Sequence, residues 1–200
     1  MIHSPEAEKK APQKRLVVGV TGASGAPLAI RLLQALKSTP IETHLVLSDM
    51  AKVTILQETV WSVSEVLSLA DYSYAHQDVS AAIASGSFVT MGMVVIPCSV
   101  KTLSAIANSY TADLIARAAD VTLKEGRRLI LVFREAPLHP GHIRLMARAA
   151  ENGAIIFPPV PAFYTHPARV EELVDQIVGR ILMRMGIDND LYHAWEGPHA

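Results

Sequence analysis

The turn TGASGAP, which begins at Thr21, follows a short apolar run from Arg15 to Val20 and precedes a helical pattern over residues 28–37. An apolar run without polar alternation is typical of a strand that is buried on both faces, as strands are in parallel sheets. A glycine-containing turn that leads from such a strand into a helix indicates the first unit of a parallel α/β sheet. This single feature constrains the fold most strongly.

The same alternation of apolar runs and helical patterns continues along the chain. Further strands are predicted at residues 42–48, 93–97, 129–133 and 154–157. Between and after them, helices are predicted at 50–58, after Ser62 with Glu65 completing a capping box, at 102–107, from Thr111 until Gly126, at 140–152, and from Pro167 to Met185. The segment 72–92 shows only a short helix near 78–84 and a loop at 85–87.

We therefore predict an α/β protein with a Rossmann-like or flavodoxin-like three-layer fold around a central parallel sheet. Residues 1–14 carry charges and two prolines without periodicity, and we interpret them as a flexible N-terminal extension. Residues 15–186 are predicted to form one domain, and residues 187–200, which include Trp195, a C-terminal arm.

Charge and apolar content exclude several kinds of partner. The 18 Lys and Arg nearly cancel the 19 Asp and Glu, and no basic stripe with interleaved aromatics occurs, so no nucleic acid is expected. The longest apolar runs are shorter than the roughly 20 residues that cross a bilayer, so no membrane partner is expected. Only 18% of the residues are charged. Since this leaves little polar material to cover a small isolated domain, we expect a homo-oligomer.

Cysteine and histidine patterns bear on location and metals. Cys98, the single cysteine, ends a predicted buried strand and is expected to be an inert packed thiol. One cysteine cannot form an internal disulfide, which fits a reducing compartment, and we expect a cytoplasmic protein. None of the eight histidines forms a pair with metal-ligand spacing, so no metal site is predicted.

Polar residues that follow the strands are the candidates for a ligand site, because ligands of such folds bind beyond the carboxyl ends of the strands. They are Gly22, Ala23 and Ser24 in the first turn, Ser48, the stretch Ser99, Val100, Lys101 and Thr102, the pair Arg134 and Glu135, and Tyr164 in the segment PPVPAFY. The first turn offers N–H groups to an anion at a helix amino end, and we favour a mononucleotide site. A tight turn that merely needs glycine stays an alternative, and Ser48, Ser99 and Thr102 could simply be helix caps.

Charged residues on helices form a second group of candidates. Arg117, Asp120 and Lys124 share a helix face, which favours a solvated row of ion pairs. Arg180 stands among apolar helix residues, which indicates a contact with an anion or with another subunit. Glu58 is interpreted either as a surface residue or as part of the site.

The motifs TGASG, HLVLS, SGSF, IPCSVKTLSAIA, ARAADVTLKE, REAPL and PPVPAFY, in this order, resemble those of the UbiX-type flavin prenyltransferases. The resemblance runs from Arg15 to Trp195, while Gly126 and Phe133 vary and the N-terminal extension lies outside it. It implies a Rossmann-like flavin-binding homo-oligomer, dodecameric in the family, with FMN bound between subunits. The implied reaction transfers a dimethylallyl group from dimethylallyl monophosphate to N5 and C6 of reduced FMN, and the product serves UbiD-type decarboxylases.

The resemblance also implies roles for particular residues. Contacts to FMN are implied for Gly22, Ala23, Ser24, Ser48, Ser99, Val100, Lys101, Thr102 and Arg134, with Arg117 near the flavin. The prenyl phosphate is implied to contact Lys124, Glu135, Tyr164 and Arg180, and Ser24 and Glu58 to lie near the reacting flavin. Cations and donors at Lys124, Arg180, Tyr164 and Arg134 suit the charge that grows on a leaving phosphate. Glu58 or that phosphate would accept the proton lost from C6, and Glu135 would shuttle a proton to the phosphate.

Two other functions remain open from the residues. A flavin-dependent decarboxylase of cysteine or aromatic acids is the first. Cysteine decarboxylases, however, carry a P-A-S-A-N-T type loop and a catalytic His, whereas the matching loop here begins Pro97, Cys98, Ser99. The second is a flavin carrier without catalytic activity, which would bind FMN and leave it unchanged.

Overall fold

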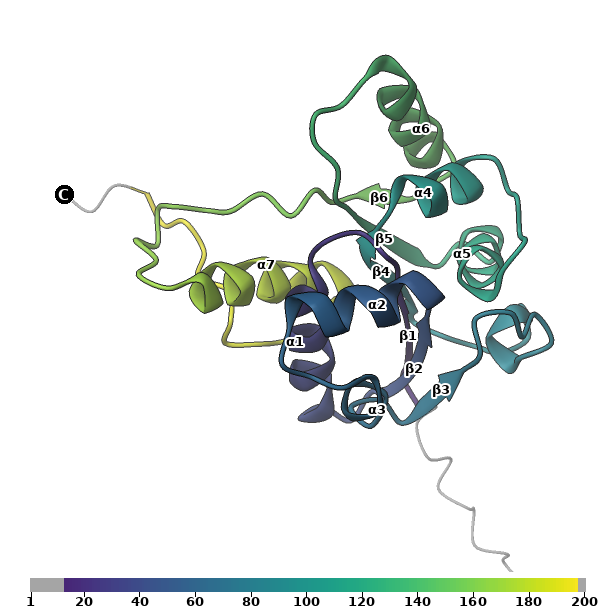
Figure 1. Ribbon diagram of the computed structural model, residues 1–200, viewed down its shortest axis with the longest axis horizontal. Helices are drawn as coiled ribbons and strands as arrows, with labels where there is room; N and C mark the ends of the chain where they lie inside the picture. Colours follow the sequence, from purple (N-terminus) through teal and green to yellow (C-terminus); the bar gives the residue numbers. More distant parts are fainter. Residues whose placement is uncertain (1–12, 198–200) are drawn as a thin grey trace, which may run out of the picture.

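The computed structural model describes residues 13–197, and its centre is a six-stranded sheet in the order β3-β2-β1-β4-β5-β6 (Figure 1). All neighbouring strands are parallel. The strands are β1 (Arg15–Val20), β2 (Glu42–Leu47), β3 (Tyr72–Tyr74), β4 (Gly92–Cys98), β5 (Arg128–Phe133) and β6 (Ile155–Ile156). The helices are α1 (Ala26–Lys37), α2 (Asp49–Glu58), α3 (Val63–Leu67), η1 (Ala82–Ala84), α4 (Val100–Ala107), α5 (Leu114–Lys124), α6 (Pro140–Glu151) and α7 (Val170–Met185).

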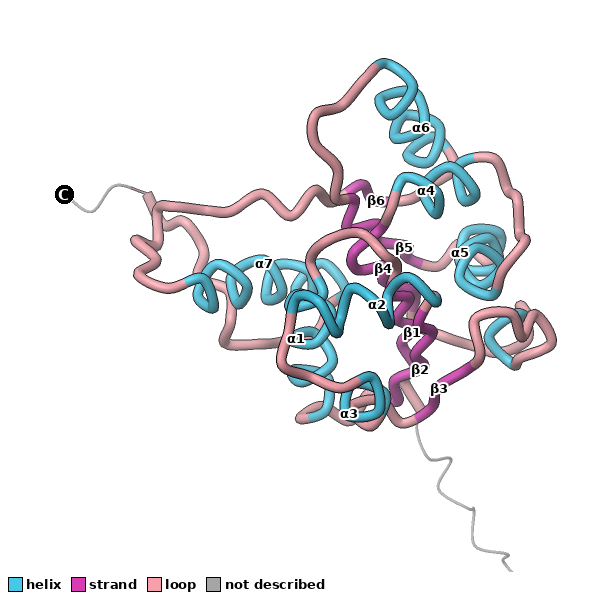
Figure 2. The backbone as a smooth tube through the Cα atoms, viewed as in Figure 1, coloured by secondary structure: helices cyan, strands magenta, loops and turns pink. Residues whose placement is uncertain are grey.

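Side chains of the strands alternate between two cores on opposite faces of the sheet. In β4, Val94 and Ile96 belong to one core, and Met93 and Val95 to the other. Helices α1, α2, α3 and α7 cover the first core, and α4, α5 and α6 cover the second (Figure 2). This arrangement confirms the predicted three-layer α/β fold and explains why its central strands are apolar along their whole length.

The strand order reverses between β1 and β4, which pair with each other although β2 and β3 come between them in the sequence. In open parallel sheets the ligand crevice forms at such a switch point, outside the carboxyl ends of the strands. The turn after β1 and the start of α4 after β4 therefore meet where a ligand is expected.

Most predicted elements agree with the structure to within two residues, but one strand was missed and three helix predictions are wrong. Strand β3 was not predicted, and the helix near 78–84 is reduced to η1. Helix α5 begins after Asp113 rather than at Thr111, because the Asp113 carboxylate caps it by accepting a hydrogen bond from Ala116 N (2.9 Å). Helix α7 begins at Val170, after Arg169, so Pro167 is not in its first turn.

The predicted terminal segments are described in part. Residues 1–12 of the predicted N-terminal extension lie outside the described residues. The arm beyond Gly186 turns back along α7: Asn189 Nδ2 donates to Gly179 O (3.1 Å), and His193 N donates to Gln176 Oε1 (2.9 Å). No helix in the described part of the chain combines the length and the apolar character that crossing a bilayer requires.

Candidate functional site

Thr21 joins the two loops that meet at the switch point. Its hydroxyl donates to Pro97 O (2.7 Å) and accepts a hydrogen bond from Ser99 N (2.9 Å). The side chain is 2% exposed, so both hydrogen bonds are shielded from water. The turn after β1 and the start of α4 are therefore fixed to each other by hydrogen bonds within the chain.

Two helices direct their amino ends toward this edge of the sheet. Ser48 caps α2 by accepting from Ala51 N (3.1 Å), and Ser99 caps α4 by accepting from Thr102 N (3.4 Å). Ser99 Oγ also donates to Thr102 Oγ1 (3.2 Å). Both serines are thus caps, which was the simpler interpretation, yet a helix amino end with a hydroxyl beside it also suits a phosphate.

The amino end of α1 is occupied by a carboxylate of the protein itself. Glu58, the last residue of α2, accepts hydrogen bonds from Gly25 N (2.8 Å) and Ala26 N (2.9 Å). The N–H groups of Gly25 and Ala26 are therefore bonded within the chain. The mononucleotide site stays a prediction for Gly22, Ala23 and Ser24.

The pKa of Glu58 lies below its ordinary value of 4.5. Partial burial acts to raise this pKa, but it is outweighed by hydrogen bonds from the Ser24 hydroxyl and from the N–H groups of Gly25 and Ala26, with a smaller effect of the Arg134 charge. Glu58 is therefore held as a carboxylate with weakened basicity.

Gly22 lets the first turn lie directly against α2. A Cβ at this position would lie 2.3 Å from Met50 Cβ, which is closer than two carbon atoms approach. The requirement for glycine here is therefore structural. The same close approach places the turn residues beside Ser48 at the α2 amino end.

Arg134 and Glu135 follow β5 at the same edge of the sheet. Arg134 N donates to Cys98 O (3.1 Å), which keeps this segment beside the loop that leads into α4. The Glu135 carboxylate accepts from Ala136 N (2.9 Å). Both residues are exposed, so their charges can meet a ligand or a second chain.

Arg117 and Lys124 lie on α5, apart from this edge. Arg117 pairs with Asp120 (3.4 Å), as the predicted ion-pair row requires, but Lys124 pairs with Glu125 (2.5 Å) instead of Asp120. Arg117 Nε also donates to Ala84 O (3.1 Å). Of the predicted row of ion pairs, the Arg117–Asp120 pair is present and the Asp120–Lys124 pair is not. Arg117 and Lys124 both lie beside the loop 85–87.

Tyr164 and Arg180 belong to a third region, formed by α7 and the two segments that lie along it. The Tyr164 hydroxyl donates to His193 O and accepts from Gln176 Nε2, both at 2.9 Å. Arg180 donates to the Tyr192 hydroxyl and lies 5.3 Å from the centre of its ring. Both residues line a cavity of about 280 Å³. Burial and the neighbouring Tyr192 raise the pKa of Tyr164, so its hydroxyl stays a hydrogen-bond donor.

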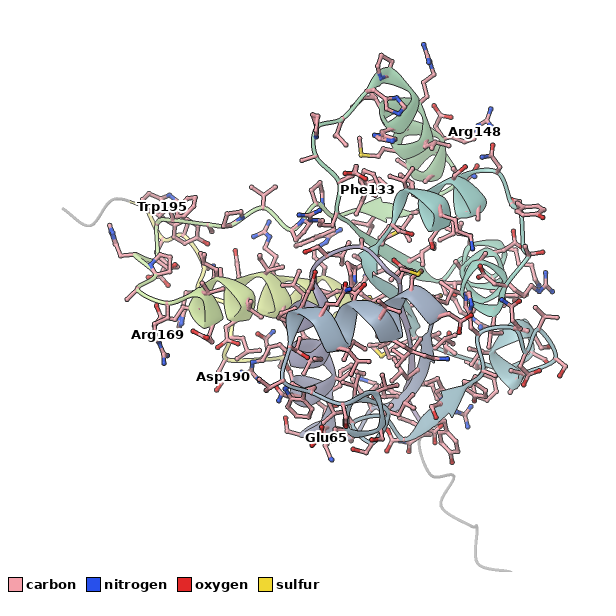
Figure 3. The ribbon with its side chains drawn as sticks, viewed as in Figure 1. Glu65, Phe133, Arg148, Arg169, Asp190 and Trp195 are labelled. Carbon is pink, nitrogen blue, oxygen red and sulfur yellow. The ribbon has the colours of Figure 1, made fainter. Side chains whose placement is uncertain are left out.

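One chain does not bring these three regions together. The arm with Trp195 extends to one side of the molecule, Phe133 at the end of β5 lies near the centre, and α5 lies on the far side from the arm (Figure 3). The predicted residues therefore form a strand-edge group, an α5 group with Arg117 and Lys124, and an arm group with Tyr164 and Arg180.

Cys98 does not contribute reactive chemistry to the strand-edge group. The thiol is fully buried, and burial raises its pKa well above the ordinary value, so it is not a thiolate nucleophile. Within residues 13–197, no three His, Cys, Asp or Glu side chains lie where they could hold a metal ion together.

Two polar residues that the sequence analysis did not single out, Gln176 and Arg127, support these regions, together with Trp195 of the predicted arm. Gln176, which is 5% exposed, orients Tyr164. Its position beside the apolar Ile177 and Val178 is a signal that could have identified it. Trp195 packs edge-on against Tyr164, with ring centres 5.5 Å apart. Arg127 holds the loop beside Lys124, and no sequence pattern indicates this contact.

Comparisons with known proteins agree on one family. A family model described as Flavoprotein matches residues 4–182. The chain is 54% identical over 187 residues to the flavin prenyltransferase UbiX of Escherichia coli K12, covering 92% of this chain and 99% of the relative. A crystal structure of AnUbiX (PadA1) in complex with FMN and dimethylallyl pyrophosphate superimposes with a TM-score of 0.92 at 49% identity, covering 94% of this chain and all of that one. A dodecameric FMN-dependent Ubix-like decarboxylase from Escherichia coli O157:H7 gives a TM-score of 0.90 at 49% identity, covering 92% and 100%.

Proposed function

Since the chain belongs to the UbiX-type flavin prenyltransferases, we propose that it joins the dimethylallyl group of dimethylallyl monophosphate to N5 and C6 of reduced FMN. The observation that carries this proposal is the preformed switch-point edge, where Thr21 fixes the first turn against the start of α4. The curated relatives are named flavin prenyltransferases, which favours prenyl transfer over the decarboxylase alternative, although one of the similar solved structures carries a decarboxylase name. A flavin carrier would leave FMN unchanged.

The residues at this edge fit FMN. With Glu58 at the α1 amino end, the capped ends of α2 and α4 are the helix ends that suit the flavin phosphate. Ser48, Ser99 and Thr102 supply hydroxyls, while Gly22, Ala23 and Ser24 let the backbone approach the ring. Val100, Lys101 and Arg134 complete the contacts. Reduced FMN supplies the electron-rich N5 and C6 atoms for the reaction.

The donor phosphate meets the residues of the other two regions. Lys124, Arg180 and Tyr164 offer cations and a hydroxyl to the charge that grows as the allylic C–O bond breaks. Arg117 adds positive charge near the flavin. Glu135 moves a proton to the departing phosphate.

The hydrogen bonds of Glu58 favour the departing phosphate over Glu58 as the base. Because its carboxylate already accepts two backbone hydrogen bonds and has a lowered pKa, Glu58 is a poor base for the proton on C6. We assign that proton to the departing phosphate, with Glu135 as the relay. The proton that N5 loses balances the prenyl double bond, which takes up one proton as its far carbon joins C6. Glu58 then orients Ser24 and supplies a fixed negative charge near the allylic cation.

The proposed oligomer brings the α5 group of one chain beside the arm group of another. A single phosphate can contact both the α5 group and the arm group only if they come from different copies of the chain, so we propose a homo-oligomer, specifically a dodecamer. A relative of the same fold is a dodecamer. Helix α2 also exposes an apolar row next to the flavin edge, formed by Met50, Val53, Leu56 and, just beyond the helix, Val60.

We further propose that the product passes to a UbiD-type decarboxylase and that the enzyme works in the cytoplasm, which suits its one buried thiol. The test of the proposed function is an anaerobic incubation with reduced FMN and dimethylallyl monophosphate, followed by mass spectrometry of the extracted flavin. The proposal predicts flavin heavier by one dimethylallyl group. Unaltered flavin with every donor would contradict it.

A further inference from the structure

The loop 85–87 is attached to α5 and to the segment that follows it by two arginines, Arg117 in the first turn of the helix and Arg127 just beyond its end. Arg127 donates to Gly86 O (2.7 Å) and to Phe88 O (2.8 Å), and its side chain is only 15% exposed. Arg117 donates to Ala84 O at the other end of the loop. The loop therefore has a fixed position relative to the last turn of α5.

Lys124 and Glu125 form an ion pair in the space between this loop and the helix. Lys124 Nζ lies 2.5 Å from one carboxylate oxygen of Glu125, and Arg127 lies 4.0 Å from the other. Hydrogen bonding to Lys124 lowers the pKa of Glu125. Since ion pairs this exposed contribute little to stability, fold stability alone does not explain the arrangement.

The ion pair occupies space that any side chain at position 86 would fill, so the pair fits because this residue is Gly86. A Cβ on Gly86 would lie 2.1 Å from Glu125 Oε1 and 2.8 Å from Lys124 Nζ. The atoms it would meet are the ends of flexible side chains, and Gly86 has no left-handed φ angle. An alanine here would therefore displace the ion pair without straining the backbone.

We infer that Glu125, Gly86 and Arg127 are positioning residues that hold the Lys124 ammonium in place for the prenyl phosphate. A lysine ammonium on a flexible stem has many positions, and ordering it only when the donor arrives weakens binding. Its three N–H donors allow one to bond Glu125 while two remain for the phosphate. This inference rests on the proposed role of Lys124.

The most direct variant is Gly86→Ala, which keeps every charge and moves only the pair. It should raise the KM for dimethylallyl monophosphate roughly 3- to 10-fold, with a smaller change in kcat. FMN affinity, oligomer size and the unfolding temperature should stay at parental values. A parental donor KM in the folded Gly86→Ala enzyme would overturn the inference.

Glu125 variants separate positioning from charge. Glu125→Ala should raise the donor KM as Gly86→Ala does, whereas Glu125→Gln keeps an oxygen that can accept from Lys124 and should stay within about twofold of the parent. Glu151→Ala, the loss of an exposed acid on α6, is the control for net charge and should have no effect. If both Glu125 variants lowered the KM, Glu125 would be a competitor of the phosphate and the inference would be wrong.

A double-mutant cycle ties the effect to Lys124. The double variant Lys124→Ala/Glu125→Ala should be no worse than Lys124→Ala, because Glu125 acts only through the lysine. Additive losses would overturn the inference while leaving the role of Lys124 intact. A parental donor KM in Lys124→Ala itself would overturn both that role and the inference, without affecting the proposed FMN prenylation.

Discussion

The carboxylate of Glu58, at the end of α2, accepts a hydrogen bond of 2.8 Å from the backbone N–H of Gly25, at the start of α1. The N-cap residue of α1, Gly25, makes no side-chain cap. Glu58, which belongs to the next helix of the chain, supplies the cap instead. The first turn of this fold class commonly binds a phosphate. Here a protein carboxylate fills that position, so we propose that the flavin phosphate meets the amino end of α2 or α4.

We predict that Glu58→Gln loses about 0.3–1 kcal/mol of stability at pH 7, because the amide keeps an oxygen that can accept from Gly25 N and Ala26 N but lacks the negative charge that the α1 amino end favours. Because the folded pKa of Glu58 lies below its ordinary 4.5, the stabilisation is present above that pH and is lost as the pH falls through the folded pKa. Urea unfolding of both proteins at pH 7 and near pH 4 checks this. A difference that does not shrink at the lower pH would contradict it.

His44 gives the fold a second pH dependence. It is 2% exposed, with Nδ1 2.8 Å from the Tyr74 hydroxyl and Nε2 2.9 Å from a Glu42 oxygen, and Arg15 pairs with the same carboxylate. Burial lowers the His44 pKa despite the opposing effect of Glu42. The unfolded chain therefore binds more protons, so stability is complete above about pH 6.5 and falls as the pH drops below it.

The variant His44→Phe, which can keep the stacking on Tyr72, should show a smaller decrease in unfolding free energy between pH 6.5 and 5 than the parent. The control His166→Gln, an exposed residue, should keep the parental slope. Equal slopes in His44→Phe and the parent would show that His44 is not the responsible group.

Sequence reasoning succeeded where a local pattern carries the information. Strand β4 is buried on both faces and is therefore an apolar run in the sequence. The edge strand β3 has two exposed residues, Tyr72 and Ser73, and a half-buried Tyr74, so it gives no such signal. The caps Ser48 and Ser99 could be identified as candidates from their places after strands. The contacts of Glu58 with α1 and of Arg127 with loop 85–87 could not, because they join segments far apart in sequence and depend on how helices pack.

Arg180 and Tyr164 are predicted to act on the prenyl phosphate and not on FMN. Losing a charge-assisted hydrogen bond to a leaving group costs on the order of 2–4 kcal/mol in the transition state, so Arg180→Ala and Tyr164→Phe should each slow prenylation roughly 30- to 1000-fold. FMN binding should hardly change. Arg184→Ala, an exposed arginine on the same helix, is the matched control. A variant that lost FMN first would refute this assignment.

Prenyl transfer should not need a divalent metal. The sequence lacks an Asp-rich motif for a diphosphate–magnesium complex, and Lys124 and Arg180 can neutralise a monophosphate. The rate with dimethylallyl monophosphate should therefore be the same with and without EDTA. Loss of turnover in EDTA that magnesium restores would count against this prediction.

The division of the site among copies of the chain is tested most directly by mixing two impaired variants, each of which lacks one of the two cations. If Lys124 of one copy and Arg180 of another serve the same phosphate, oligomers formed by co-expressing Lys124→Ala and Arg180→Ala chains in equal amounts should contain about a quarter of sites with both native residues. The account predicts that these mixed oligomers convert reduced FMN at about a quarter of the parental rate, measured by the mass of the extracted flavin. Mixed oligomers no more active than either variant alone would contradict it.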